Sequence, residues 1–434
     1  MKRNTVIKTA AVLGVVSLSL AACGGSSSST ESAAPASTAA APASSAAAEC
    51  TTTTLTLGTL LPQTGQLAFL GTPMIDGATY AIDAINKAGG VNGAPVTQIN
   101  VDESDSSTDV ASQSVDSLIA KGATAVVGAA STSNSLNVLD KVTSNGLVMV
   151  SPSNTGPVMT TVEDNGLYFR TAPSDALQGL VLADKASKDG KTNIAVIARQ
   201  EPYGQGLAKA FIDNFTAAGG TVAGGDAIYY DPAATSFEAE VSKIKAAKPD
   251  AVVVVSYDEG AKIVQEMIKQ GVGPQDVQLY LVDGNLSATA YKDFEKDVMK
   301  GTIGTRPAGA DVTKFNDELK KFDPNLKDVI YGAESYDAAT IIALAAQAAG
   351  CADGKAIAAK MLDVVGNGGE KCTNYADCAK LLAAGTDVDY EGQSGPLDMT
   401  SIGDLSSATI TINEYTNNTE TKQIDSQQAQ VPAS

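Results

Sequence analysis

The stretch ATAVVGAASTSN, residues 123–134, joins a short apolar run to a turn of small and hydroxyl-bearing residues. The run 123–128 has the length and composition of a strand buried in a parallel sheet. Residues 129–134 then supply Ser, Thr and Asn side chains, which favour the first turn of a helix. A strand followed by a helix is the repeating unit of parallel α/β sheets, so this stretch predicts the fold class.

The same alternation extends along most of the chain. Before Arg170, strands are predicted at 55–61, 96–101, 123–128 and 147–150, with helices that include 74–88 and 110–121. After Arg170 the pattern begins again, with strands at 193–198, 222–229, 251–255 and 278–282 and helices near 203–218, 237–247 and 259–270. A third region contains predicted helices near 313–321, 334–349, 355–364 and 374–384 and a closing strand at 408–413. The sequence therefore predicts an α/β protein with two successive doubly wound parallel sheets.

The N-terminus carries the pattern of an export signal that ends at a cysteine. A basic segment with Lys2, Arg3 and Lys8 comes first, an apolar run follows it, and small residues stand directly before Cys23. This pattern predicts a lipoprotein signal peptide over residues 1–22, with Cys23 as the acylated first residue of the mature chain. Of the 26 residues that follow Cys23, 20 are Ser, Ala or Pro, so residues 23–50 are predicted to be the lipidated cysteine and a flexible tether. We expect the protein to be extracytoplasmic and lipid-anchored to the outer face of the cell membrane.

Composition excludes several functional classes. The formal net charge is −19, which argues against a nucleic acid partner because phosphate binding needs clustered Lys and Arg. No apolar run after the signal reaches about 18 residues, so no later membrane span is expected. The chain has no histidine, which removes the Ser-His-Asp and Cys-His arrangements.

The carboxylates Asp102, Glu103, Asp105 and Asp109 follow a predicted strand. They lack the glycine and the spacing of a calcium loop, so they are interpreted as a solvated turn. No catalytic constellation, metal site or cofactor is predicted, and we expect the protein not to be an enzyme.

Besides Cys23, the chain has four cysteines, Cys50, Cys351, Cys372 and Cys378. An even number in an exported chain indicates two disulfide bonds, for which three pairings are possible. The short separation of Cys372 and Cys378 favours a local bridge, which leaves Cys50 to pair with Cys351. Zinc is disfavoured because the usual close pairs and any histidine are absent.

Ligands of open parallel sheets bind beyond the carboxyl ends of the strands. In the first half, the loops 129–134 and 151–155 are rich in donors; each could simply cap a helix, but together they predict a cradle for a carboxylate. In the second half, the loops 201–204, 256–258 and 282–285 carry acids and tyrosines, which can hold a cation. The Asp-Gly pair at 283–284 is also a common turn when taken alone. Opposite the cradle, it predicts half of a site for a zwitterion.

Ordered motifs cover nearly the whole folded part. They are the segment 58–65, AINKAGG at 84–90, VG at 127–128, SP at 151–152, FRT at 169–171, YGQG at 203–206, YEGQSGP at 390–396 and GD at 403–404. In this order the motifs resemble the type I periplasmic binding proteins of branched-chain amino acid ABC transporters, the leucine/isoleucine/valine-binding proteins. The resemblance spans about residues 55–412.

The resemblance implies two α/β lobes joined by three crossover strands near 171–174, 305–309 and 391–394. Lobe I is then formed by residues 51–171 and 309–390, lobe II by residues 172–308 and 391–416, and residues 417–434 form a polar C-terminal tail. The helix near 334–349 would run in lobe I from the cleft to the far end, where Cys351 would meet Cys50.

The resemblance also assigns a ligand site. The carboxylate-binding hydroxyl falls on Thr132, or on Ser131 if the loop shifts by one residue. A second carboxylate contact falls on Ser153, Asn154 and Thr155, and Thr155 also matches a hydroxyl that helps to hold the amine. Two tyrosines of the family match Tyr203 and Tyr257, and the carboxylate that binds the amine matches Asp283. Leu70 stands at the position over the ligand side chain.

By resemblance, the protein is the solute-binding receptor of an ABC importer. It would capture an amino acid, with branched-chain amino acids as the first choice, deliver it to membrane permease subunits and act as a monomer without a cofactor. Leu70 replaces a frequent aromatic residue, Ser153 and Asn154 replace a small apolar pair, and Asp283 replaces the longer Glu. These departures leave an amide or urea-like solute open, and a sensor that presents its ligand to a signalling partner is a further alternative.

Overall fold

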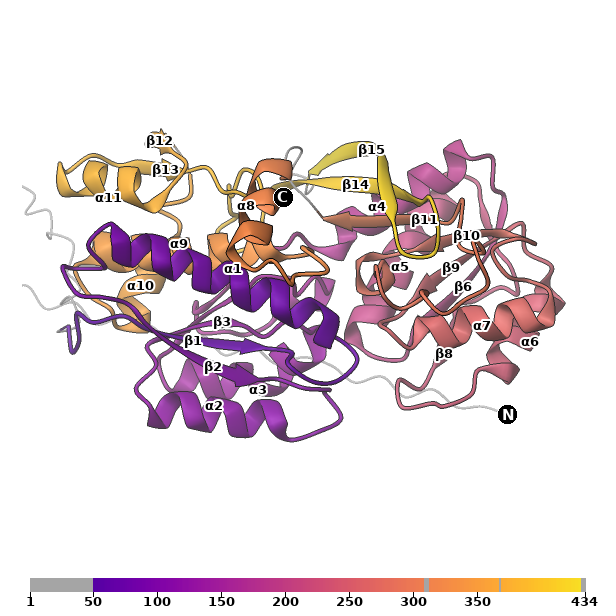
Figure 1. The fold of residues 1–434 in the computed structure, drawn as a ribbon, viewed down its shortest axis with the longest axis horizontal. Helices are drawn as coiled ribbons and strands as arrows, with labels where there is room; N and C mark the ends of the chain where they lie inside the picture. The colour runs from indigo at the N-terminus through magenta and orange to yellow at the C-terminus, as the bar shows by residue number, and fades with distance from the viewer. Residues whose placement is uncertain (1–49, 308–311, 367, 431–434) are drawn as a thin grey trace, which may run out of the picture. The chain divides into compact units, whose positions relative to one another are not determined.

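Two α/β lobes make up the part of the chain that the computed structural model describes, which is residues 50–307, 312–366 and 368–430 (Figure 1). Each lobe is built on its own sheet, and the predicted fold class is confirmed. The predicted signal peptide, Cys23 and the tether up to residue 49 lie outside the described residues.

Lobe I is built on a parallel sheet with the strand order β2-β1-β3-β4-β5. Its strands are β1 (Thr56–Leu61), β2 (Thr97–Asp102), β3 (Ala125–Gly128), β4 (Val148–Ser151) and β5 (Tyr168–Arg170). Its helices are α1 (Ala68–Lys87), α2 (Val110–Ala120), α3 (Thr132–Ser144), the 3-10 helix η1 (Pro157–Thr161), α8 (Thr313–Phe322), α9 (Gly332–Ala349), α10 (Gly354–Met361) and α11 (Tyr375–Ala383). A small parallel sheet of β12 (Glu370–Cys372) and β13 (Val388–Tyr390) completes the lobe.

Strand β3 shows how this sheet comes to have two buried faces. Successive side chains of a strand point to opposite faces. Ala125 and Val127 belong to a core shared with α1, α9 and α10, whereas Val126 belongs to a core shared with α2 and α3. Because helices cover both faces, β3 is apolar at every position, which is why its sequence predicts a strand of a parallel sheet.

Lobe II is built on a mixed sheet with the order β15-β14-β11-β10-β9-β6-β7, and β8 also pairs with β6. Its strands are β6 (Asn193–Arg199), β7 (Thr221–Val222), β8 (Ile228–Tyr230), β9 (Ala251–Val255), β10 (Gln278–Leu281), β11 (Ile303–Pro307), β14 (Ser407–Tyr415) and β15 (Thr421–Gln430). Helices α4 (Asp175–Lys188) and α5 (Pro202–Ala217) share one core with this sheet, and α6 (Glu238–Ala247) and α7 (Gly260–Gln270) share the other. A short 3-10 helix, η2 (Asp283–Asn285), follows β10.

The chain passes between the two lobes at three places. Residues 171–174 connect β5 to α4, and residues 391–406 connect β13 to β14. Between β11 and α8 lie residues 308–311, which the structure does not describe. Among the described residues, no single helix is long and apolar enough to cross a membrane. Helices α9 and α10 reach that length and apolar character only when taken together, but they are bent by 101° relative to each other and both belong to the core of lobe I.

Two expectations from the sequence need correction. The segment 417–434 is not simply a polar tail, because Thr421–Gln430 forms β15, paired antiparallel with β14. Its side chains are almost all polar and exposed, so this edge strand is formed by backbone pairing. The sequence therefore lacks the alternation of apolar and polar residues that predicts a strand. Helix α1 also begins at Ala68, earlier than predicted, since Pro73 lies inside the helix and resembles a helix start.

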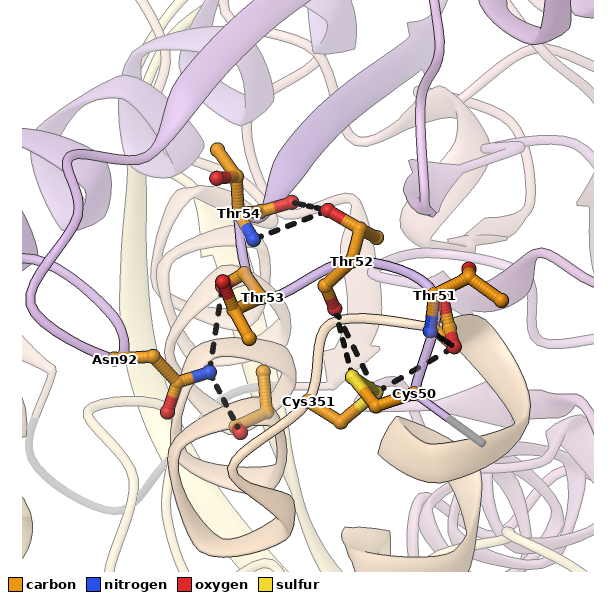
Figure 2. The surroundings of a disulfide bond; sticks show 9 residues. Cys50, Thr51, Thr52, Thr53, Thr54, Asn92 and Cys351 are labelled. Atoms are coloured by element: carbon orange, nitrogen blue, oxygen red, sulfur yellow. Dashed lines mark hydrogen bonds between the residues drawn. A yellow bond between two sulfur atoms is a disulfide. The ribbon is translucent and has the colours of Figure 1, made fainter. Parts of the chain in front are cut away.

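Two disulfide bonds confirm the pairing expected from the sequence. Cys50 is joined to Cys351 with a Cα–Cα distance of 5.8 Å, and Cys372 to Cys378 with 5.4 Å. Helix α9 ends at Gly350, whose φ of 60° is the left-handed conformation that glycine adopts readily, and the next residue is Cys351. Figure 2 shows Cys50 and Cys351 beside the segment that leads into β1, where both sulfur atoms lie near the carbonyl oxygen of Thr52.

We expect the two bridges to contribute unequally to stability. They close loops with sequence separations of 301 and 6 residues, and the entropy that a bridge removes from the unfolded chain increases with loop length. By this loop-entropy argument, replacing Cys50 and Cys351 by Ser should lower the free energy of unfolding by about 6 kcal/mol, against about 2 kcal/mol for Cys372 and Cys378. Urea unfolding of the two double variants measures this difference. Equal losses, or a Cys50–Cys372 peptide in a non-reducing digest of the parent, would contradict the account.

Candidate functional site

The loop after β3 places Thr132 at the start of α3. Ser131 is the N-cap of this helix, and its Oγ accepts a hydrogen bond from the backbone N–H of Asn134 at 3.0 Å. The hydroxyl of Thr132 donates to Oδ1 of Asn154 at 2.8 Å and accepts from the backbone N–H of Gly156 at 3.2 Å. Thr132 is thereby fixed at the end of the sheet, while the side chain of Ser131 is used in capping.

A buried glutamate supports this loop. The carboxylate of Glu103 accepts hydrogen bonds from the backbone N–H groups of Ala130 at 2.5 Å and Ser131 at 3.1 Å. Its side chain is fully buried, and this burial raises its pKa to about 8. The interpretation of Glu103 as part of a solvated turn was therefore wrong. An acidic cluster in sequence does not reveal that one member has backbone donors to bind.

The loop after β4 carries Ser153 and Thr155. Ser153 Oγ donates to the carbonyl oxygen of Ala130 at 3.3 Å, and Thr155 Oγ1 donates to Oδ2 of Asp175 at 2.8 Å. Asn154 lies behind Thr132 and is fully buried. The two donor-rich loops of lobe I therefore contact each other.

Arg170, at the end of β5, holds this loop from behind. It is completely buried and forms a bidentate ion pair with Asp404, with Nε–Oδ1 and Nη2–Oδ2 distances of 2.6 and 2.8 Å. Its Nη1 donates to the carbonyl oxygens of Asn154 at 3.3 Å and Gly156 at 3.0 Å. Two sequence motifs far apart in the chain, FRT and GD, therefore meet at this ion pair.

Lobe II contributes two tyrosines and an aspartate. The ring of Tyr203, in the first turn of α5, stacks on that of Tyr257, with 5.2 Å between the centroids and 20° between the planes. The hydroxyl of Tyr203 donates to Oδ1 of Asp283 at 3.0 Å. Asp283 begins η2, directly after the parallel strand β10, so its carboxylate lies at the carboxyl end of the sheet.

Asp283 is buried and receives two further donors. Tyr331, the residue before α9, donates its hydroxyl to Oδ2 at 2.8 Å, and Gln178 of α4 donates its amide to Oδ1 at 3.0 Å. Burial raises the pKa of Asp283, and the hydrogen bonds from Tyr331, Gln178 and Tyr203 act in the opposite direction. Donors from both lobes thus converge on one carboxylate.

These side chains surround a small cavity between the lobes. Its lining consists of Leu67, Leu70, Ala130, Thr132, Ser153, Thr155 and Tyr331 from lobe I and Tyr203, Tyr257, Asp283 and Gly284 from lobe II.

The structure brings together most of the residues that the sequence singles out. Leu70, Thr132, Ser153, Thr155, Tyr203, Tyr257 and Asp283 line the cavity, whereas Ser131 and Asn154 stand behind Thr132 and do not. Sequence reasoning missed Tyr331, Leu67 and the buried pair Asp175 and Gln178. Tyr331 follows no strand, so the rule that ligands bind at strand ends gave no signal for it.

In the part of the chain that the structure describes, one cluster has the residue types of a metal site, formed by Cys50, Cys351 and Asp353. Its two sulfur atoms are joined in the disulfide bond, which leaves a single carboxylate to act as a ligand.

Comparisons with known proteins show the family of the chain. Residues 54–369 match the family described as periplasmic binding protein. The Leu/Ile/Val-binding protein homolog 3 of Brucella melitensis is 31% identical over 319 residues, which cover 71% of this chain and 83% of that protein.

Solved structures share the fold at lower sequence identity. The branched-chain amino acid transporter substrate-binding protein of Streptococcus pneumoniae in complex with isoleucine is similar with a TM-score of 0.71 and 21% identity, covering 87% of this chain and 100% of that one. A solute-binding protein of R. palustris in complex with 4-hydroxybenzoate is similar with a TM-score of 0.70 and 18% identity, covering 87% and 98%. The resemblance inferred from the motifs is confirmed, and the chain belongs to the periplasmic binding protein family.

Proposed function

We propose that the protein is the extracytoplasmic solute-binding receptor of an ABC importer and captures an amino acid between its two lobes. The observation that carries this proposal is the buried carboxylate of Asp283 in a cavity whose opposite wall holds hydroxyl groups. A zwitterion brings a positive and a negative group, and each then meets a complementary wall.

The cavity gives each part of an amino acid a partner. Asp283 receives the ammonium group, with the rings of Tyr203 and Tyr257 beside it. The hydroxyls of Thr132 and Ser153 donate to the ligand carboxylate by turning about their C–O bonds away from their present acceptors, Oδ1 of Asn154 and the carbonyl oxygen of Ala130. The ligand carboxylate then also lies near the N-terminus of α3. Leu67, Leu70 and Ala130 supply an apolar surface for an aliphatic side chain.

Branched-chain amino acids are the first choice of ligand. The apolar residues in the cavity fit a small aliphatic side chain, and the relative from Brucella melitensis is named as a Leu/Ile/Val-binding protein homolog. An amide or urea-like solute is the second candidate, because Asp283 already accepts three hydrogen bonds from the protein and an uncharged N–H donor would suffice to complete its shell.

We further propose that Cys23 anchors the mature protein to the membrane by lipid, that the protein acts as a monomer, and that permease subunits receive its ligand. It is not an enzyme in this proposal, and a role in presenting ligand to a signalling partner is the alternative to transport. Two rigid units are proposed to move toward each other when ligand binds. Residues 51–171 with 309–390 form the first unit, lobe I, and residues 172–308 with 391–416 form the second, lobe II.

Contacts across the cleft outside the cavity support closure around a ligand. The side-chain oxygen of Gln66, in the loop before α1, accepts from Nη1 of Arg199 at 2.7 Å, and its amide donates to the carbonyl oxygen of Pro232 at 3.1 Å. Ser133 of α3 donates its hydroxyl to Glu201 across the same cleft. The guanidinium of Arg199 also lies 3.9 Å from the ring centroid of Tyr257, which connects these contacts to the cavity wall.

The ligand class is tested with leucine and two analogues, each of which lacks one end of the zwitterion. A thermal-shift assay compares leucine with leucinamide and 4-methylpentanoate, and the same panel contains isoleucine, valine, acetamide and urea. Calorimetric titration then measures the affinity of the compounds that bind. A ligand that binds only the folded state raises the melting temperature. Leucine should bind, whereas 4-methylpentanoate, which has no ammonium group, should not. Binding of 4-methylpentanoate as tight as that of leucine would contradict the role of Asp283.

Asp283→Asn tests the ammonium contact directly. Removing one partner of a desolvated charge pair costs about 2–5 kcal/mol, which corresponds to a roughly 30-fold to several-thousand-fold increase in Kd. If Asp283 only forms an Asp-Gly turn, Asn fits the turn equally well and the affinity barely changes. Calorimetry with the best ligand of the panel measures the effect, and the melting temperature without ligand reports folding. A Kd within about threefold of the parent in a folded variant would refute the contact.

Gln66→Ala tests the contribution of closure. The substitution removes two hydrogen bonds between the lobes, one of them to a charged group, and Gln66 itself does not line the cavity. We expect a loss of about 1–2 kcal/mol in binding, roughly a 5- to 30-fold higher Kd, because the closed state becomes less populated. Gln98→Ala is the matched control, since Gln98 bonds only Asn100 within lobe I. An unchanged Kd for Gln66→Ala would show that these contacts do not govern closure.

A further inference from the structure

Two buried oxygen atoms on α4 lack a hydrogen-bond donor among the described residues. They are Oδ1 of Asp175 and Oε1 of Gln178, and both side chains are fully buried. Buried acceptors are almost always paired in folded proteins, so two such atoms on one helix require an explanation. Asp175 and Gln178 are three residues apart in the first turn of the helix, where side chains at this spacing are neighbours.

The other polar atom of each side chain already forms hydrogen bonds. Oδ2 of Asp175 accepts from Thr155 at 2.8 Å, and Nε2 of Gln178 donates to Oδ1 of Asp283 at 3.0 Å and to the carbonyl oxygen of Thr305 at 3.3 Å. Rotating the Gln178 amide by half a turn would point its oxygen at Oδ1 of Asp283 and at the carbonyl oxygen of Thr305, which are both acceptors. The orientation in the structure is therefore the favourable one, and a proton on Asp175 would supply the donor that Oε1 of Gln178 lacks.

The charges around Asp175 agree with a neutral side chain. Burial and then the neighbouring carboxylate of Asp283 hold the pKa of Asp175 well above its usual range. The facing cation is Arg170, which is already bound to Asp404. The phenols of Tyr203 and Tyr331 also face this pair, and burial followed by the charge of Asp283 raises their pKa values well above the ordinary one, so both remain neutral donors.

We propose that Asp175 is a protonated, neutral acid in the folded protein and donates its proton to Oε1 of Gln178, which makes it a positioning residue for Asp283. A directed chain of hydrogen bonds then runs from Thr155 to Asp175, from Asp175 to Gln178 and from Gln178 to Asp283. The chain leaves one negative charge at the cavity, on the carboxylate that meets the ligand. The part of this inference that concerns the ligand rests on the proposed function, whereas the protonation of Asp175 does not.

Asp175→Asn imitates the protonated acid, because its amide donates to Gln178 and its oxygen accepts from Thr155. In the parent, a folded-state pKa above the unfolded value of about 3.9 contributes stability that is present at low pH and is lost as the pH rises toward the folded-state pKa. The ratio of the unfolding constants, parent over Asp175→Asn, should therefore increase by up to tenfold per pH unit as the pH rises from the unfolded value toward the folded-state pKa. Buried carboxylates that do not interact with Asp175 or Asp283, such as Glu103, titrate in both proteins and cancel in the ratio.

Urea unfolding without ligand between pH 4 and 8 provides these constants. Asp184→Asn is the matched control, because Asp184 lies on the same helix and its only ion pair is with the largely exposed Lys188. Asp175→Ser, which also removes the carboxylate and keeps a donor, gives the same comparison if the Asn variant does not fold. A ratio that stays constant through this pH range would mean that Asp175 is ionised in the folded protein, and would overturn the proposal.

Calorimetry then tests the positioning role with the best ligand of the panel. Asp175→Asn should keep its Kd within about threefold of the parent at pH 7, since the charge that meets the ligand remains on Asp283. A loss of 30-fold or more would assign a binding charge to Asp175 and overturn the proposal. Failure of every compound in the panel to bind would count against the proposed function alone, because the unfolding measurements use no ligand.

Discussion

The hydrogen-bonded carboxylate of Asp283 is the group on which the arrangement of the cleft depends. A buried charge is unfavourable unless donors compensate it, and here the donors come from three separate segments, Tyr203 of α5, Gln178 of α4 and Tyr331 before α9. Tyr331 directly precedes α9 of lobe I and the other two residues belong to lobe II, so all three donors reach the carboxylate only when the lobes are together. A ligand cation would add the one partner that the protein does not supply.

Other buried ionisable groups support the opposite wall from behind. Glu103 binds two backbone N–H groups of the loop after β3, and Arg170 joins Asp404 to two carbonyl oxygens of the loop after β4. Neither lines the cavity. The donors of lobe I are therefore placed by interactions that need no ligand, which fits a receptor whose lobes move as rigid units around the bound solute.

The sequence predicts those parts of the fold and site that depend on local pattern. Strands such as β3 are covered on both faces and read as apolar runs, and Thr132, Ser153 and Asp283 follow strands at the carboxyl end of their sheets. The rest depends on long-range contacts. Tyr331 and Asp175 reach the site from helix starts without a pattern of their own, Glu103 is buried by its backbone donors, and β15 is formed by backbone pairing with few apolar side chains.

Small-angle X-ray scattering with and without the best ligand tests most directly the claim that the lobes close on a solute at Asp283. The contacts of Gln66 and Ser133 with lobe II belong to the closed arrangement, so the scattering of the saturated protein should fit this structure. The ligand-free protein should have a larger radius of gyration, because opening separates the lobes. An identical radius of gyration in both states, at a ligand concentration that calorimetry shows to be saturating, would contradict the account.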